Sequence, residues 1–215
     1  MKKLTLITFL SLSMASIGIA QDNETDNREK FQVGLKAGLN YSNVYDESGD
    51  EFHADAKFGF AGGAIMAVPF GKYLGIQPEI LISQKGFRAT GRMLGDTYTF
   101  TRTTTYLDIP LQFAFKPSEF ITLVAGPQFS YLLSKRDVWS STTNSYAQEQ
   151  EFKNDNIRKN IFGFVGGMDI NLRHIILGGR VGWDIQNNNA DGTSTTPRYK
   201  NVWFQGTVGY NIYKN

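Results

Sequence analysis

The 215-residue chain contains no cysteine and only 2 histidines. The absence of cysteine excludes disulfide-stapled scaffolds, cysteine zinc sites, cysteine nucleophiles and lipoproteins anchored through a lipidated cysteine. Neither sign of charge is in excess, with 22 Lys and Arg against 20 Asp and Glu, so no basic footprint for nucleic acid exists. A mean hydropathy of -0.29 is too polar for a bundle of membrane helices. Glycine, by contrast, is abundant, with 22 residues against a usual share of ~7%.

One apolar run opens the chain and has the features of an export signal. Two lysines follow Met1, the residues from Leu4 to Met14 are mostly apolar, and Gly18-Ile19-Ala20 ends in the small-x-small pattern that a signal peptidase cleaves. The run is shorter than the ~20 residues that a membrane-spanning helix needs. Cleavage after Ala20 would remove both lysines and leave a mature chain without net charge. The next ten residues carry no apolar side chain and are typical of a flexible leader.

From Phe31 onward the hydrophobic period is two. Between Phe31 and Ser42 (FQVGLKAGLNYS) every odd position is apolar and every even position is polar or glycine, which is the pattern of a strand with two different faces. The pattern recurs seven more times, so we expect eight strands. Tight turns and long polar connections separate them. The expected turns lie at 71–72, 116–119 and 172–174, and the expected long loops at 43–56, 89–98, 135–160 and 187–198.

Short turns alternating with long polar loops are the organisation of bacterial outer-membrane barrels, and the expected strands reach the ~9–11 residues that a tilted membrane strand needs. A secreted lipocalin-like barrel also alternates, but its apolar face points inward around a ligand. The composition of the polar face distinguishes the membrane barrel from the secreted barrel, because this face is rich in glycine. Glycine weakens a water-facing strand but gives room inside a narrow barrel. The sequence therefore predicts an all-β, eight-stranded antiparallel up-and-down transmembrane β-barrel with its apolar face toward lipid.

The resulting domain prediction has three parts. They are a signal peptide at 1–20, a flexible leader at 21–30 and an outer-membrane β-barrel at 31–215.

The few large residues on the polar face are nearly matched in charge. Buried charges must be paired and hydrogen-bonded, and an eight-stranded barrel is just wide enough for its own side chains to fill. We therefore expect a structural network inside the barrel, in which Glu79, Asp108 and Arg180 are partners; the alternative is a polar path for a small solute or ion. Lys57 also falls on this face. The predicted interior charge network consists of Lys36, Glu79, Lys85, Asp108, Asp169, Arg180 and Asp184.

Three prolines, Pro78, Pro110 and Pro127, lie inside expected strands. Proline cannot donate to the hydrogen-bond ladder and normally marks an edge or a bulge. Because a closed barrel has no edge, we expect a local bulge at each proline.

The segments around these prolines resemble the PorT-like, porin-type outer-membrane β-barrel family. The resemblance spans about 31–213 and implies an outer-membrane barrel. Its motifs are not specific for an activity, and the family adds secretion to the functions to be considered. One departure is the C-terminus, where Tyr213 is followed by two polar residues instead of ending the chain. The matching motifs are IQPEILISQKG at 76–86, YLDIPL at 106–111, AGP at 125–127 with YLL at 131–133, and Gly179-Arg180.

Functional chemistry is sparse. The strand pattern places no serine, histidine and acid together, and the acidic stretch 46–53 lacks the spacing of a calcium loop. We therefore expect no catalytic site, cofactor or metal. The expected partners are outer-membrane lipid around the apolar belt and a surface or envelope protein bound through the long loops. Two functions stay open: a closed scaffold with binding loops, and a narrow porin whose interior glycines leave space for small solutes.

Overall fold

The structure is a computed structural model that describes residues 26–45, 54–93, 96–141, 145–149, 158–188 and 199–213. Within these residues no helix is long and apolar enough to cross a membrane. The elements are η2 (Asn27–Glu29), β1 (Gln32–Tyr45), β2 (Ala54–Pro69), β3 (Leu74–Met93), β4 (Asp96–Phe115), β5 (Ile121–Ser141), β6 (Ser145–Glu149), β7 (Asn160–Leu172), β8 (Ile175–Asp184) and β9 (Lys200–Tyr213).

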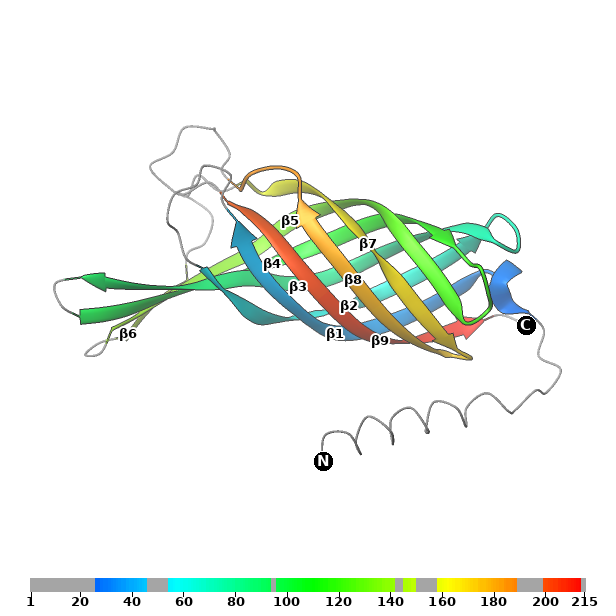
Figure 1. Cartoon of the computed structure of the whole chain (residues 1–215), viewed down its shortest axis with the longest axis horizontal. Coiled ribbons are helices and arrows are strands. Elements are labelled where there is room, and N and C mark those ends of the chain that lie inside the picture. The colour runs from blue at the N-terminus through cyan, green and yellow to red at the C-terminus, as the bar shows by residue number, and fades with distance from the viewer. Residues whose placement is uncertain are drawn as a thin grey trace, which may run out of the picture.

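Eight of the strands close into an antiparallel barrel (Figure 1). Each barrel strand pairs with the next barrel strand along the chain, so that β5 pairs with β7, and β9 returns to pair with β1. The ninth strand, β6, pairs only with the far part of β5, beyond the region where β5 pairs with β7. This arrangement confirms the predicted eight-stranded up-and-down barrel.

The two faces of the barrel wall differ in the way that the alternation predicts. Along β1, Lys36 and Asn40 are buried inside the barrel, whereas Leu35 and Leu39 on the alternate positions are exposed on the outside. The other barrel strands continue this exposed apolar belt, which is the surface that faces lipid in an outer-membrane barrel. In such a belt, burial comes from the membrane, so exposed leucine and phenylalanine side chains need no covering element.

Strands β3, β4 and β5 extend past the barrel at one end, where β6 joins them (Figure 1). We call this extension the surface sheet: residues 88–93, 96–103, 136–141 and 145–149. It corrects two predicted loops, because most of 89–98 and a part of 135–160 are paired strand. Threonine and aromatic residues, which favour strands, dominate β4 here and explain why the polar composition did not end the strand. The predicted loop residues 46–53 and 189–198 lie outside the described residues.

The prolines do not create the expected bulges. The register between β3 and β4 is the same on both sides of Pro78, and the registers around Pro110 and Pro127 are likewise unbroken. Each proline interrupts the ladder locally without inserting a residue, so the strand loses pairing there but does not shift. The register shifts lie elsewhere, between Ala56 and Ala61 of β2 and beside Thr105 of β4.

The inward glycines make room for backbone. A Cβ atom added to Gly38, Gly63 or Gly126 would collide with the carbonyl oxygen of a residue on the neighbouring strand. Strands that coil tightly around a narrow barrel approach closely on the inner face, where only glycine fits. The space predicted from these glycines is therefore occupied by neighbouring strands at these positions.

Candidate functional site

The first interior group is the arginine cluster, centred on Arg180 of β8. Its guanidinium donates two hydrogen bonds of 2.8 Å to the carboxylate of Asp169 on β7. It also lies 3.5 Å from Glu79 of β3, which forms an ion pair with Lys36 of β1. Two amides complete the cluster, since Gln112 accepts from Arg180 at 3.1 Å and Gln77 donates to Asp169 at 2.9 Å.

The second group, the lysine cluster, lies farther along the strands toward the surface sheet. The ammonium of Lys85 is 3.0 Å from a carboxylate oxygen of Asp108 and 3.7 Å from the ring centroid of Trp203. The carboxylate of Asp184 accepts hydrogen bonds from both the backbone and the side chain of Asn201. Two carboxylates and one ammonium are thus held among aromatic and amide groups.

All seven residues of the predicted interior network lie inside the barrel, but in two groups. Asp108 forms its ion pair with Lys85 rather than with Glu79 and Arg180, although the register of β3 and β4 sets Asp108 opposite Leu81 and Lys85 opposite Thr104. Lys57 belongs to neither group; its ammonium donates to the carbonyl of Phe58. The sequence analysis missed the amides Gln77 and Gln112, although both occupy inward positions of the alternating pattern.

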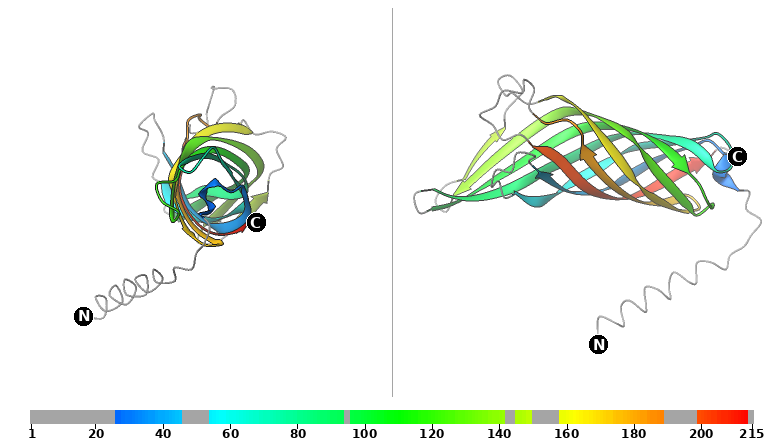
Figure 2. Two further views of the ribbon diagram at one scale, coloured as in Figure 1. Left: turned by 90° about the vertical axis from the view of Figure 1, so that its right-hand side faces the viewer. Right: turned by 45° about the horizontal axis from the view of Figure 1, so that its top comes forward.

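The end of the barrel that carries the short turns is covered by the chain's own N-terminal segment (Figure 2). We call Asp26–Lys30 the N-terminal turn. Its carbonyl at Arg28 accepts a 2.9 Å hydrogen bond from Lys116 in the β4–β5 turn, and Asp26 lies 3.4 Å from Lys72 in the β2–β3 turn. This part of the predicted flexible leader is therefore folded and tethered to the barrel; residues 21–25 lie outside the described part of the chain.

Asp26 also organises the turn itself. Its side chain caps η2 by accepting from the backbone N–H of Arg28 at 3.1 Å, and it pairs with the guanidinium of the same residue at 2.6 Å. These contacts to Arg28 stabilise the ionised carboxylate and hold the pKa of Asp26 well below its usual range. The tether therefore depends on a carboxylate that stays charged in mild acid.

At the opposite end, one face of the surface sheet carries an aromatic and charged group. Arg102 of β4 donates two hydrogen bonds of 2.8 Å to Asp137 of β5 and one of 3.3 Å to the hydroxyl of Tyr199. Beside this pair, the rings of Phe100 and Trp139 lie 4.5 Å apart between centroids. The ion pair fixes the relative position of the two strands, and the indole is left 47% exposed.

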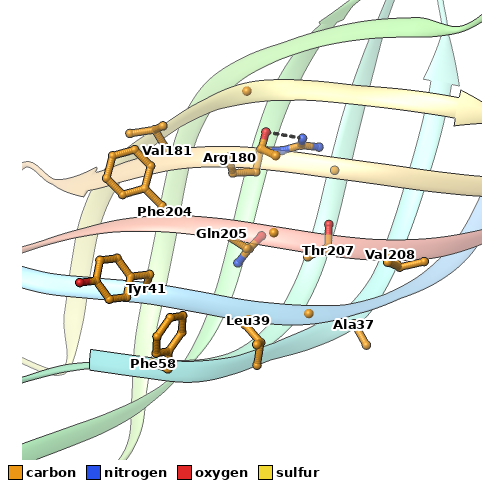
Figure 3. A pocket seen from close by; sticks show the side chains of 15 residues that line it. Ala37, Leu39, Tyr41, Phe58, Arg180, Val181, Phe204, Gln205, Thr207 and Val208 are labelled. Carbon is orange, nitrogen blue, oxygen red and sulfur yellow. Dashed lines mark hydrogen bonds between the residues drawn. The ribbon is translucent and has the colours of Figure 1, made fainter. Parts of the chain in front are cut away.

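The outer face of the barrel has a groove of 790 Å³ where β8, β9 and β1 meet (Figure 3). Its lining is mostly apolar or glycine, with the rings of Tyr41, Phe58 and Phe204 on one side, and its polar members are Arg180, Gln205 and Thr207. Among the described residues, no group of three or more histidine or acidic side chains is arranged to hold a metal ion.

A closed barrel with an apolar outer belt and a charged, buried interior defines an integral outer-membrane protein. A family model described as "Outer membrane protein beta-barrel domain" matches residues 19–189, and the chain belongs to this family. The protein is therefore located in the outer membrane. No curated protein matches it in sequence.

Several solved structures are similar in fold. Ail, the attachment invasion locus protein of Yersinia pestis, is 13% identical, with 85% of this chain and 99% of that chain covered and a TM-score of 0.45. Neisserial surface protein A is 9% identical, with 84% and 96% covered and a TM-score of 0.44. OprG from Pseudomonas aeruginosa is 11% identical, with 89% and 100% covered and a TM-score of 0.40.

Proposed function

We propose that the protein is a closed, non-enzymatic scaffold in the outer membrane that binds a protein partner through its surface sheet. The burial of the interior charges carries this proposal. None of the seven charged residues of the interior network is more than 6% exposed. A water-filled path through the barrel would leave these groups accessible to water, because they lie on the inner wall at several heights.

The interior glycines support the same function. In a porin, inward glycines would widen the passage. Here the backbone of neighbouring strands occupies the space beside Gly63 and Gly126. The N-terminal turn adds a second closure, since it lies across the end of the barrel that carries the short turns (Figure 2). Short turns face the periplasm in outer-membrane barrels, so we assign this closed end to the periplasmic side.

The surface sheet supports a binding role. Strands β3, β4 and β5 are 20, 20 and 21 residues long, about twice what is needed to cross the hydrocarbon. The extra length presents Trp139 and the exposed Arg136 on a paired, rigid sheet, and exposed aromatic and arginine residues dominate protein-binding surfaces. The resemblance to PorT-like proteins makes a component of envelope assembly or secretion the partner that we favour. Export would use the signal peptide at 1–20.

The conduction test separates the two functions directly. Purified protein in a planar bilayer should give no steady single-channel current, for wild type and for a variant that lacks the residues before Phe31. Steady, reproducible conductance in the wild type would establish a porin and overturn the closed-scaffold proposal. Conductance only in the shortened variant would show that the N-terminal turn is the sole closure, which contradicts a packed interior.

The binding test uses photocross-linking in whole cells. A photoreactive amino acid at Trp139 should give one discrete protein adduct of higher mass, whereas the same amino acid at Leu111, on the lipid-facing surface of β4, should give none. Equal labelling from both positions, or no adduct from Trp139 and its neighbours on β5, would contradict binding through the surface sheet.

A further inference from the structure

Two glycines on the outer face of the barrel differ from the glycines of the inner face. Gly179 of β8 and Gly206 of β9 are paired across the two strands, and both point outward. A Cβ atom added at either position would have nothing within 4 Å. Inside the barrel, by contrast, an added Cβ at Gly167 would collide with a neighbouring carbonyl. The fold therefore requires glycine at the inner position but not at the outer pair.

An outward-facing glycine in a membrane strand lowers the stability of the barrel, and no contact inside the barrel offsets this loss. Glycine loses more conformational freedom on folding than other residues and contributes no side chain to the apolar belt. The consequence of the Gly179–Gly206 pair is instead a recess in the outer surface. Leu39, Tyr41 and Phe204 border this recess, so that bulky side chains surround a floor made of backbone (Figure 3).

The recess has the size and chemistry of a site for an apolar ligand. Its volume of 790 Å³ falls within the 300–1,000 Å³ typical of small-molecule pockets. It lies in the apolar belt and is continuous with the lipid interface of the barrel, where the surrounding solvent is hydrocarbon. An acyl chain fills such a groove without leaving any hydrogen-bonding group unsatisfied.

The residues at the short-turn end of β8, below the groove, indicate which class of lipid the groove binds. β8 begins directly after the turn that holds Arg173 and His174, both exposed at the short-turn end of the barrel. From Arg173 to Gly179 the strand rises about 20 Å, at ~3.3 Å per residue. With a strand tilt of ~45° this is about 14 Å along the membrane normal, roughly half of the ~30 Å hydrocarbon core. A phosphate beside Arg173 would thus place the end of its acyl chain in the recess.

We propose that the groove between β8, β9 and β1 binds one acyl chain of a glycerophospholipid from the periplasmic leaflet, with the lipid phosphate at Arg173 and His174. The groove shares no lining residue with the surface sheet, so it is independent of the proposed binding function. It assigns a purpose to the Gly179–Gly206 pair, for which the fold has no steric need.

The first test maps lipid contacts on the unmodified protein. Phosphatidylglycerol with a photoreactive diazirine near the end of one acyl chain is incorporated into proteoliposomes that contain the full mature barrel. Peptides from β8 and β9 should be labelled several-fold more than peptides from the lipid-facing parts of β3 and β4. Uniform labelling around the barrel would overturn the proposal, and this result does not depend on any variant folding correctly.

Matched variants then locate the site. Gly206→Leu fills the recess and should abolish the enrichment. Ala125→Leu, which enlarges an exposed side chain on β5, two strands away from β8, should preserve it. Arg173→Gln should lower labelling by phosphatidylglycerol but not by a diacylglycerol with the same diazirine. Enrichment that persists in Gly206→Leu would overturn the proposal.

Two further outcomes would assign the groove to another occupant. Enrichment with diazirine-labelled lipid A but not with phosphatidylglycerol would place a lipopolysaccharide chain in the groove and overturn the phospholipid assignment. Gly179→Cys introduces a unique thiol, because the chain has no cysteine. Efficient disulfide-linked dimers of this variant in membranes would show that a second copy of the barrel covers the groove, which also overturns the proposal.

Discussion

Arg180 with Asp169 inside the barrel, and Arg102 with Asp137 in the surface sheet, form the same bidentate ion pair in two different settings. In both pairs the two nitrogen–oxygen distances are 2.8 Å. The interior side chains are 2% and 3% exposed, whereas those of the surface sheet are 15% and 12% exposed. The interior pair also touches further charges, while the surface pair borders the aromatic rings around Trp139.

The comparison shows that the contribution of an arginine–aspartate ion pair to stability depends on how far its surroundings exclude water. A buried ion pair loses its hydration, so each partner depends on the other and removal of one leaves an uncompensated charge. When one residue of an ion pair near the surface is removed, water can hydrate the remaining charge, so the protein loses less stability. A third such pair, Arg28 with Asp26 in the N-terminal turn, has the most exposed carboxylate, at 33%, beside an arginine that is 13% exposed. The three arginine–aspartate pairs thus lie in three settings: the barrel interior, the surface sheet, and the N-terminal turn at the short-turn end.

The largest effect is expected for Arg180→Met. Methionine keeps the length of the side chain but leaves Asp169 and Glu79 with less compensating charge in a buried site, so the free energy of unfolding should fall by about 3–5 kcal/mol. Urea unfolding in detergent micelles, followed by tryptophan fluorescence, measures this change. Arg136→Met, at an exposed position of β5, is the matched control and should stay within about 0.5 kcal/mol of wild type. Unchanged stability of Arg180→Met would mean that water reaches the cluster.

A smaller effect is expected for Arg102→Met in the surface sheet. Lys135 remains 3.3 Å from Asp137 and compensates part of its charge, so the loss should be about 1.5 kcal/mol, the lower end for hydrogen bonds to charged groups. The same unfolding experiment measures it. A loss as large as that of Arg180→Met would show that the surface sheet is as dry as the barrel interior. The position of Trp139 should change as well, which reduces the photocross-linking yield from that residue.

The smallest effect is expected for Asp26→Asn, which should release the N-terminal turn without changing global unfolding. A nitroxide attached to Glu29→Cys reports the mobility of the turn. In the protein with Asp26 the label should stay immobilised from pH 7 to mild acid and become mobile only in strong acid. The reason is that the lowered pKa keeps Asp26 ionised, so its stabilisation is present above the usual carboxyl pKa and is lost as the pH falls through the lowered value.

In Asp26→Asn the label should be mobile at every pH, and Lys72→Met should give partial release because it removes the weaker partner of Asp26. A label that remains immobilised in Asp26→Asn would show that the hydrogen bond from Lys116 holds the turn without the carboxylate.

Much of the fold could be predicted from the sequence, because apolar and polar residues alternate with a period of two along the barrel strands. The alternation of Lys36 and Asn40 with leucines placed the inner and outer faces correctly, and the three short turns were found where expected. The length of β3 and β4 was underestimated, because beyond the membrane both faces of a strand meet water and the apolar period ends before the strand does. The prolines misled for a related reason, since a ladder can lose local pairs without a register shift.

The sequence by itself determined that Arg180, Asp169, Glu79 and Lys85 are inside, because a side chain's face depends only on its position along a strand. Which of these charges meet was decided only by the tertiary structure, because partners across the interior depend on strand register and barrel stagger, which link residues far apart in the chain. The same holds for the outer surface. Gly179 and Gly206 are two unremarkable glycines in the sequence, and they form a recess only because the pairing of β8 with β9 sets them side by side.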